Sequence, residues 1–248
     1  MGKTHQALQR AEKEHQENFV TLRTRKDLPD TQTPAFPVKT GAQYIDEYES
    51  LKTSLLSRYR PEELKTIVFT GAAYNTGTST TAANFARSMA RDAWRSVFLI
   101  DANLRHPCLH ELFQVDHKNG LTDFMGDENI SIPQFKKLKS NFYLHTTGSL
   151  RSQSYGIFHS AKFDNFLQII RQNFDHVIID CPPAPAFPET RVIAGKTDGV
   201  VFVLDSGVTG QSAALRAKKD LEEVGAKLLG VVLNKRKYHI PEWLYRKL

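Results

Sequence analysis

The sequence predicts an α/β protein with a mostly parallel sheet and helices on both faces. Short apolar segments alternate with helical segments over most of the 248 residues, which is typical of a parallel sheet covered on both sides. A loop of small residues, Gly71–Thr78, follows the first apolar segment and precedes a helix rich in Ser and Thr. Asp101 and Asp180 end two further apolar segments, at the edge of the sheet where such proteins bind ligands.

Apolar spacing predicts the individual elements. Residues 44–58 form a helix, because Tyr44, Tyr48, Leu51 and Leu55 recur at helical spacing. Short apolar runs predict strands, and longer stretches of helix formers predict helices. The expected strands are 67–70, 97–101, 142–146, 176–180, 199–204 and 228–233, and the further helices are 79–91, 161–173 and 211–224.

Four segments organise the chain. Residues 1–20 are rich in helix formers and predict an N-terminal helix with few apolar residues. Residues 21–40 contain three prolines and predict a linker. Residues 41–234 form the single α/β domain, and 235–248 form a basic tail with interleaved aromatic residues. This tail is read as a phosphoacceptor segment, a membrane-surface contact, a docking peptide or a solvated end.

Charge and cysteine content exclude several classes of protein. The net charge is +6, but the excess of Lys and Arg lies in 1–40 and 235–248, whereas 41–234 is neutral. A nucleic-acid binder should carry a basic face on its folded body, so we expect no nucleic-acid partner. Cys108 and Cys181 are the two cysteines and form no C-x-x-C pair, which fits a reducing cytosol rather than a disulfide framework. No apolar run reaches the roughly 18 residues of a membrane span.

The loop after the first strand has the features of a phosphate cradle. Backbone N–H groups converge in such a loop, and the following helix adds the positive end of its dipole. Gly77, Thr78, Ser79 and Thr80 are therefore candidate nucleotide-binding residues. The Ser79 hydroxyl stands where phosphate loops place a Mg²⁺ ligand.

This loop lacks the cation that phosphate loops carry. The pattern G-x-x-x-x-G-K-[ST] requires Lys where Thr78 stands, and residues 70–81 contain no basic residue. The spacing of Gly71 and Gly77 is also one residue longer than the pattern. Taken alone, the loop is equally well read as a plain strand-turn-helix connection.

The two strand-end acids favour the nucleotide-binding interpretation. One Asp at a strand end is commonly a helix N-cap, but two of them after a phosphate-type loop are typical of a Mg²⁺ site. We expect Asp180 and Ser79 to hold the metal. Asp101 is expected to contribute to the metal site and to act as the base or to orient the attacking hydroxyl.

These motifs resemble the bacterial tyrosine kinases of capsule and exopolysaccharide systems, the free-standing cytoplasmic type. That family has D-A-D-L-R-x-P, V-I-I-D-x-P-P and a V-L-N strand after its phosphate loop. This chain has DANLRHP at 101–107, VIIDCPP at 177–183 and VLN at 232–234, and THQALQRAE at 4–12 resembles the N-terminal helix of some members. Close relatives of the family are the partition and septum-site ATPases, which share its P-loop NTPase fold.

The resemblance implies a set of ligands and partners. It implies ATP and Mg²⁺ as cofactors, with Asn234 at the adenine edge, although an Asn that ends a strand is also a turn former. It further implies autophosphorylation of C-terminal tyrosines, for which Tyr238 and Tyr245 are the candidates. Ring assembly of identical subunits and a membrane chain-length regulator as partner complete the set. The expected location is the cytoplasm, peripheral to the inner membrane through that partner or through the basic tail.

Several positions depart from the family pattern. Thr78 replaces the loop lysine, Asn103 replaces the second acid of the first acidic motif, and Glu189 stands where the family has Asp. The family's ring-forming helix carries an acid and two arginines at three-residue spacing. Here these positions are Asp46, Glu49 and Lys52, with the middle charge reversed.

Three functions follow, in order of preference. The first is a kinase-like regulator of exopolysaccharide synthesis and export that has lost most phosphotransfer, because removing a cation that stabilises transition-state charge costs roughly 10²–10³ in rate. The second is an active, ATP-dependent tyrosine autokinase whose lysine comes from elsewhere. The third is a partition-type ATPase, against which Ala73 counts because it stands at the position of that class's extra lysine.

Overall fold

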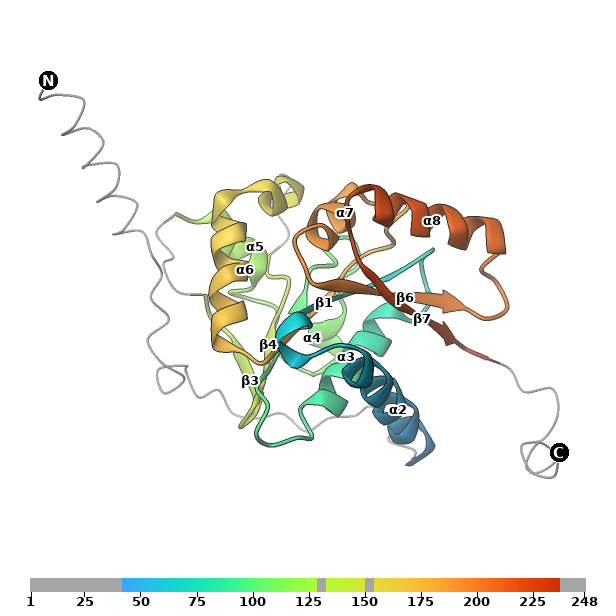
Figure 1. Cartoon of the computed structure of the whole chain (residues 1–248). Coiled ribbons are helices and arrows are strands. Elements are labelled where there is room, and N and C mark those ends of the chain that lie inside the picture. The colour runs from blue at the N-terminus through green and yellow to red at the C-terminus, as the bar shows by residue number, and fades with distance from the viewer. Residues whose placement is uncertain (1–41, 129–132, 150–153, 237–248) are drawn as a thin grey trace, which may run out of the picture.

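A seven-stranded sheet forms the centre of the molecule in this computed structural model, which describes residues 42–128, 133–149 and 154–236 (Figure 1). The strand order is β3-β4-β2-β5-β1-β6-β7. The strands are β1 Thr66–Gly71, β2 Val97–Asp101, β3 Lys136–Lys139, β4 Phe142–His145, β5 His176–Asp180, β6 Gly199–Asp205 and β7 Leu228–Asn234. All neighbouring strands are parallel except β3, which pairs antiparallel with β4 at one edge.

Helices cover both faces of this sheet, as the alternating pattern predicts. Seven α-helices lie within the described ranges: α2 Ala42–Arg58, α3 Thr78–Met89, α4 Leu109–Leu112, α5 Leu121–Gly126, α6 Ala161–Asn173, α7 Pro188–Ala194 and α8 Gln211–Glu223. Two short 3₁₀ helices, η2 Pro61–Glu63 and η3 Ser154–His159, lie among them.

Two apolar clusters fill the space on either side of the sheet. One joins α5, α6, α7 and α8 to the strand side chains on their face, and Phe98, Phe166 and Phe202 belong to it. The other joins α2, α3 and α4 to the opposite strand side chains, and Phe69 and Phe85 belong to it. Strands β1, β2 and β5 are buried along their whole length, because helices shield both of their faces.

The predicted α/β fold with a mostly parallel sheet is confirmed. The bounds of β2, β5 and α6 agree with those expected, and the other predicted elements differ by a few residues at their ends. The sequence did not reveal β3 or the short helices α4, α5 and α7. The expected N-terminal helix at 1–20, the linker at 21–40 and the tail tyrosines Tyr238 and Tyr245 lie outside the described residues. Within the described part of the chain, no helix is both long and apolar enough to cross a membrane.

Helix α2 is fixed to α3 through a largely buried lysine. The Lys52 ammonium lies 2.6 Å from Glu49 Oε2 and 3.5 Å from Asp92 Oδ1, and it donates to the Ser88 carbonyl at 3.4 Å. The Ser88 hydroxyl donates in turn to Glu49 Oε1 at 2.8 Å. Two of the three positions in the predicted ring-forming helix, Glu49 and Lys52, therefore make contacts within the same subunit.

Removal of this buried charge should loosen the packing of α2. Lys52→Met keeps the apolar stem but leaves Glu49 and Asp92 without their shared cation, so we expect a loss of about 1–3 kcal/mol in the free energy of unfolding. Urea unfolding measures this loss. Lys219→Met on α8 is the matched control, because Lys219 is exposed and its ion pair with Glu223 should contribute less than about 0.5 kcal/mol. Equal effects of the two substitutions would contradict the structural role of Lys52.

Candidate functional site

Three predicted site residues lie at the carboxyl ends of strands, on the side of the sheet where the predicted phosphate loop begins. Strand β2 ends at Asp101, β5 ends at Asp180 and β7 ends at Asn234, while β1 leads at Gly71 into the predicted phosphate loop. Asp101 and Asp180 are direct neighbours in the register of the parallel pair β2 and β5. Since parallel strands end at a common edge, residues far apart in the sequence meet around the loop.

The loop between β1 and α3 has the backbone shape of a phosphate cradle. Asn75 and Gly77 both have positive φ angles, of 59° and 85°. Gly77 is the N-cap of α3 and has no side chain that could accept from the first N–H groups of the helix. A Cβ atom at Gly77 would lie 2.2 Å from Asn234 Nδ2, so the close approach of β7 also requires glycine there. The positive end of α3 therefore faces the loop without a side-chain cap.

Thr78 does not provide the positive charge that a lysine would provide at this position. Its hydroxyl lies 2.9 Å from the Thr76 hydroxyl, within the loop itself. It carries no charge and stays among the loop's own polar groups. Ser79 is half-buried one residue further into α3, and Thr80 is exposed.

Asn234 ties the edge of the sheet to the phosphate loop. Its Nδ2 group donates to the Thr76 carbonyl at 2.8 Å. The amide side chain thus fixes the loop, whatever it contributes to binding adenine. Both interpretations of Asn234 offered by the sequence remain compatible with this position.

Asp101 and Asp180 are fully buried and are held very differently. Asp101 Oδ1 accepts from the Asn103 N–H at 3.2 Å, and Oδ2 accepts from the Leu109 N–H at 3.1 Å. Neither carboxylate oxygen of Asp180 has a hydrogen-bond partner. A buried carboxylate without partners is costly, so Asp180 is suited to a ligand that brings positive charge.

Burial raises the pKa of both carboxyl groups. Desolvation raises the pKa of Asp101 to about 6, although the N–H donors from Leu109 and Asn103 oppose the shift. Desolvation, and then repulsion from Asp101, raise the pKa of Asp180 well above its usual value, while the nearby Ser79 hydroxyl lowers it. Because the two groups repel each other when both are charged, the first ionisation of the pair raises the pKa of the second.

A cysteine that the sequence did not single out belongs to the same cluster. Desolvation raises the pKa of Cys108 to about 12, the Ser79 hydroxyl opposes the shift, and Asp180 and Asp101 add to it. Cys108 directly precedes α4. The first N–H of that helix, from Leu109, donates to Asp101 Oδ2. The thiol is therefore neutral at ordinary pH and forms part of the wall around Ser79.

The residues present fit Mg²⁺ with a nucleotide better than an autonomous metal site. Among the described residues, no group of three or more His, Cys, Asp and Glu side chains could hold a metal ion. Mg²⁺ usually takes one or two carboxylates and completes its shell with waters and phosphate oxygens. The partnerless Asp180 carboxylate, Asp101 and Ser79 offer such a partial set beside the loop.

Arg105, within the first acidic motif, pairs with an acid of a neighbouring helix. Its Nε lies 3.0 Å from Oε1 of the buried Glu189 on α7, and its guanidinium lies over the Phe187 ring. Tyr74, in the phosphate loop, makes edge contacts with Phe187 and His106. This aromatic group joins the loop to the start of α7.

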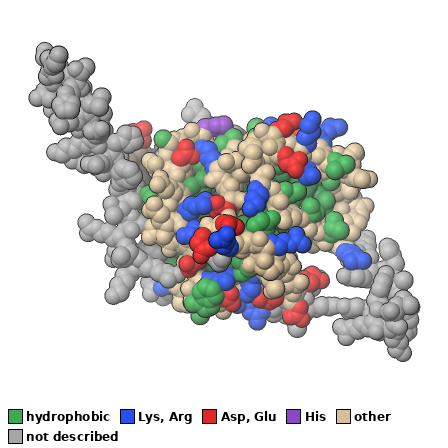
Figure 2. Space-filling model, in the orientation of Figure 1, with side chains coloured by type: hydrophobic (Ala, Val, Ile, Leu, Met, Phe, Trp, Pro, Cys, Tyr) green, Lys and Arg blue, Asp and Glu red, His purple; other side chains and the backbone are tan. Residues whose placement is uncertain are grey.

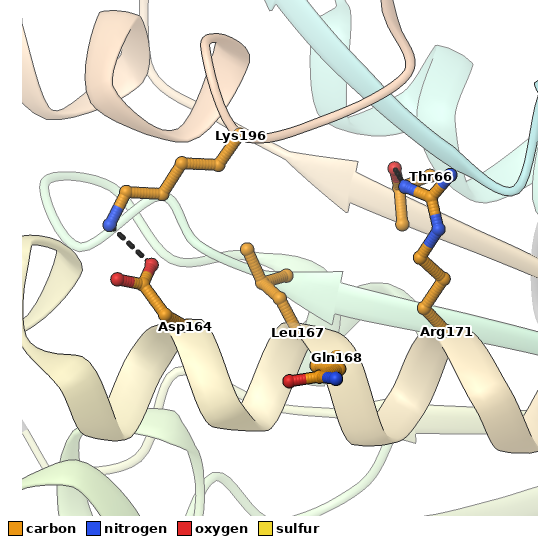
Figure 3. A pocket seen from close by; sticks show the side chains of 6 residues that line it. All are labelled: Thr66, Asp164, Leu167, Gln168, Arg171 and Lys196. Atoms are coloured by element: carbon orange, nitrogen blue, oxygen red, sulfur yellow. Dashed lines mark hydrogen bonds and ion pairs between the residues drawn. The ribbon is translucent and has the colours of Figure 1, made fainter.

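A cavity at the amino ends of the strands is separate from this site. The cavity of about 270 Å³ lies at the start of β1 and alongside α6 (Figure 3). Arg171 on its wall lies 2.6 Å from Asp198. Lys196 pairs with Asp164 across the cavity wall (Figure 3). Its cations are thus already paired within the chain, and it contains none of the predicted site residues.

The fold is that of an α/β protein with a mostly parallel sheet, in which the predicted phosphate loop and two buried acids meet at the carboxyl ends of the strands. No family model matches the chain. The sequence is 29% identical to the tyrosine-protein kinase YwqD of Bacillus subtilis (strain 168) over 194 residues, covering 77% of this chain and 81% of the relative. It is also 29% identical to the tyrosine-protein kinase CpsD of Streptococcus pneumoniae serotype 4 over 200 residues, covering 80% and 86%.

Solved structures agree with these relatives. The kinase domain of the Escherichia coli tyrosine kinase ETK superposes with a TM-score of 0.73 at 23% identity, covering 90% of this chain and 89% of that domain. This likeness shows the shared fold. Together with the curated relatives it confirms the resemblance to bacterial tyrosine kinases that the strand-end motifs indicated.

The metal-free carboxyl pair should make stability depend on pH. An unfolded Asp titrates near 3.9, whereas the buried pair holds its proton to higher pH, so the folded state binds more protons in between and loses stability as pH rises. Asp180→Asn removes one carboxyl, and we expect it to raise the midpoint of thermal unfolding by about 2–6 °C at pH 7.5. The gain should fade toward pH 4.5.

Thermal unfolding in a chelating buffer at the two pH values measures this effect. Asp220→Asn on α8 removes an acid outside the pair and should leave the midpoint within about 1–2 °C at either pH. A variant Asp180→Asn that is less stable than the wild type at pH 7.5 would show that the pair is not under electrostatic strain.

Proposed function

We propose that the protein is a tyrosine-kinase-like regulator of exopolysaccharide or capsule biosynthesis and export, which holds ATP and Mg²⁺ but transfers phosphate weakly or not at all. One observation carries the proposal. The Thr78 hydroxyl is engaged with Thr76 where a lysine would contact the phosphates, while the partnerless Asp180 carboxylate remains beside the loop.

The roles of the site residues follow from their positions. Gly77, Thr78, Ser79 and Thr80 surround the nucleotide phosphates through the loop and the start of α3. Ser79, Asp101 and Asp180 complete the shell of Mg²⁺, which screens the charge of the triphosphate. In this proposal Asp101 orients or deprotonates an attacking hydroxyl, and Asn234, which donates to the Thr76 carbonyl, also contacts the adenine edge.

Loss of the lysine should damage transfer more than binding. One charge-assisted hydrogen bond contributes roughly 1.5–3 kcal/mol, and the backbone N–H groups and Mg²⁺ continue to hold the phosphates. The lysine's second task is to stabilise charge that develops during transfer, and a missing donor of that kind costs roughly 10²–10³ in rate. Retention of ATP with slow turnover is the expected result.

Partners and location are part of the same proposal. The regulator acts in the cytoplasm at the inner membrane, through a membrane chain-length regulator of polysaccharide synthesis, and it associates with further copies of itself. Tyr238 and Tyr245 are its candidate phosphoacceptors. The neutral sequence of 41–234 argues against nucleic acid, and Figure 2 shows acidic and basic side chains intermixed over the visible face.

An active autokinase is the second candidate. The convergence of Ser79, Asp101 and Asp180 supports it, because these groups would be dispensable in a protein that had abandoned Mg²⁺ chemistry. A partition-type ATPase is disfavoured by Ala73, which stands where that class carries its extra lysine.

The substitution Thr78→Lys, which restores the loop cation, distinguishes the weakly transferring regulator from the active autokinase. We expect Thr78→Lys to bind Mg²⁺-ATP roughly tenfold more tightly than the wild type and to raise tyrosine phosphorylation at least tenfold from a low basal level. Binding of a fluorescent ATP analogue and incorporation of labelled phosphate measure the two effects. Thr78→Val controls for the change in the loop, and Asp101→Ala identifies phosphorylation that depends on the site.

Robust tyrosine phosphorylation by the wild type, abolished in Asp101→Ala, would refute the proposed weak transfer and favour the autokinase. Absence of Mg²⁺-ATP binding in both the wild type and Thr78→Lys would refute a nucleotide-binding function altogether.

A further inference from the structure

A lysine outside the phosphate loop reaches into it. The Lys235 ammonium donates a hydrogen bond to the carbonyl oxygen of Asn75, a loop residue 160 positions earlier in the chain. Residues 71–79 contain no Lys or Arg of their own. Lys235 therefore brings positive charge to a loop that lost its usual source at Thr78.

The backbone directs Lys235 toward the loop. Strand β7 ends at Asn234, and Lys235 then adopts a left-handed conformation with φ of 55°, which turns the chain sharply. Its N–H donates to Asn234 Oδ1 at 2.9 Å, while Asn234 Nδ2 donates to the Thr76 carbonyl at 2.8 Å. Two consecutive residues thus contact two consecutive loop carbonyls.

An acid on the neighbouring strand holds this ammonium in place. Asp205 ends β6 directly opposite Asn234 in the parallel register, and its Oδ2 lies 3.1 Å from Lys235 Nζ. The lysine side chain remains 48% exposed, so the ammonium is also open to a ligand that approaches from solvent. A half-exposed lysine with one acidic partner can exchange a neutral carbonyl acceptor for a charged one.

We propose that Lys235 is the phosphate-binding cation of this protein, a role that rests on the proposed function as an ATP-binding regulator. Without nucleotide, the ammonium holds the Asn75 carbonyl and keeps the loop shaped. When a triphosphate arrives, a phosphate oxygen takes over one N–H, because an anionic acceptor forms a stronger hydrogen bond than a neutral carbonyl. Asp205 retains another of the three N–H groups.

The position of Lys235 in the fold supports ATP binding without supporting phosphate transfer. A lysine at position 78 would belong to the first turn of α3, beneath the phosphates, whereas Lys235 comes from the sheet edge at the end of β7. It compensates for charge in the bound nucleotide without occupying the position from which the loop lysine acts. Retained affinity for ATP and slow phosphate transfer then both follow from a cation at position 235 in place of one at position 78.

Nucleotide affinity of charge-neutral variants tests the proposal. Lys235→Gln should weaken Mg²⁺-ATP binding roughly tenfold or more, the amount expected for one charge-assisted hydrogen bond, and should affect AMP less because AMP lacks the β- and γ-phosphates. Lys235→Arg should stay within about threefold of the wild type, since it keeps the charge. Calorimetric titration of the wild type and both variants with Mg²⁺-ATP and with AMP, at fixed ionic strength, measures these affinities.

Lys227→Gln is the matched control. It removes the same charge just before β7, at the opposite edge of the sheet, where Lys227 lies over the Tyr59 ring. The control should bind Mg²⁺-ATP like the wild type. Equal affinities of Lys235→Gln and Lys227→Gln, with the wild type binding normally, would overturn the role of Lys235 and leave the proposed function intact. A wild type that does not bind Mg²⁺-ATP would overturn both.

A double substitution provides an independent check. If Lys235 compensates for Thr78, then adding Thr78→Lys should make the protein tolerant, and Lys235→Gln should cost less than about threefold in that background. A loss as large as in the wild-type background would show that Lys235 contributes through loop structure rather than through shared charge. Thermal unfolding of each variant distinguishes this outcome from simple loss of folding.

Discussion

The parallel pairing of β2 with β5 determines the chemistry of the whole edge of the sheet, because it places two acids side by side in a buried position. Asp101 and Asp180 are neighbours in register, and only Asp101 is hydrogen-bonded by backbone N–H groups. The folded chain therefore carries an uncompensated acid where the loop between β1 and α3 offers N–H groups and the positive end of a helix. Such an arrangement costs stability in the isolated protein and is relieved by a cation that arrives with its own anion.

The conformation of the phosphate loop depends on contacts from the end of the edge strand β7 as much as on the loop's own sequence. Its carbonyls at Asn75 and Thr76 accept from Lys235 and Asn234 at the end of β7. The Tyr74 ring contacts Phe187, directly before α7, and His106 in the first acidic motif. The glycine at position 77 is required for this close approach. The loop is thus held from two sides, and these contacts fix its shape without any contribution from a charged residue at position 78.

Sequence reasoning recovers the fold because buried parallel strands produce continuous apolar runs. Strands β2 and β5 were predicted with their observed bounds for this reason, and the acids that end them predicted where the candidate site lies. Strand β3 was missed because its sequence, KKLK, has no apolar alternation, and α4 and α7 are too short to show a helical period.

Contacts set by tertiary packing could not be read from the chain in the same way. The proximity of Cys108 to Ser79 depends on where α4 begins, and the contact of Lys235 with Asn75 joins residues that share no motif. The partnerless state of Asp180 is equally invisible in sequence, because an acid at the end of a strand is more often satisfied by neighbouring N–H groups.

The composition of β3 has a consequence for how copies of this protein can meet. A sheet edge with free backbone groups is a template for another chain, and aggregation commonly begins there. β3 is only four residues long, runs antiparallel to β4, and has Lys at three of its positions, so charge repulsion discourages two such edges from joining. The opposite edge, β7, is longer and exposes Val231 and Leu233. Among the described residues, backbone pairing between two copies is therefore favoured at β7 and disfavoured at β3.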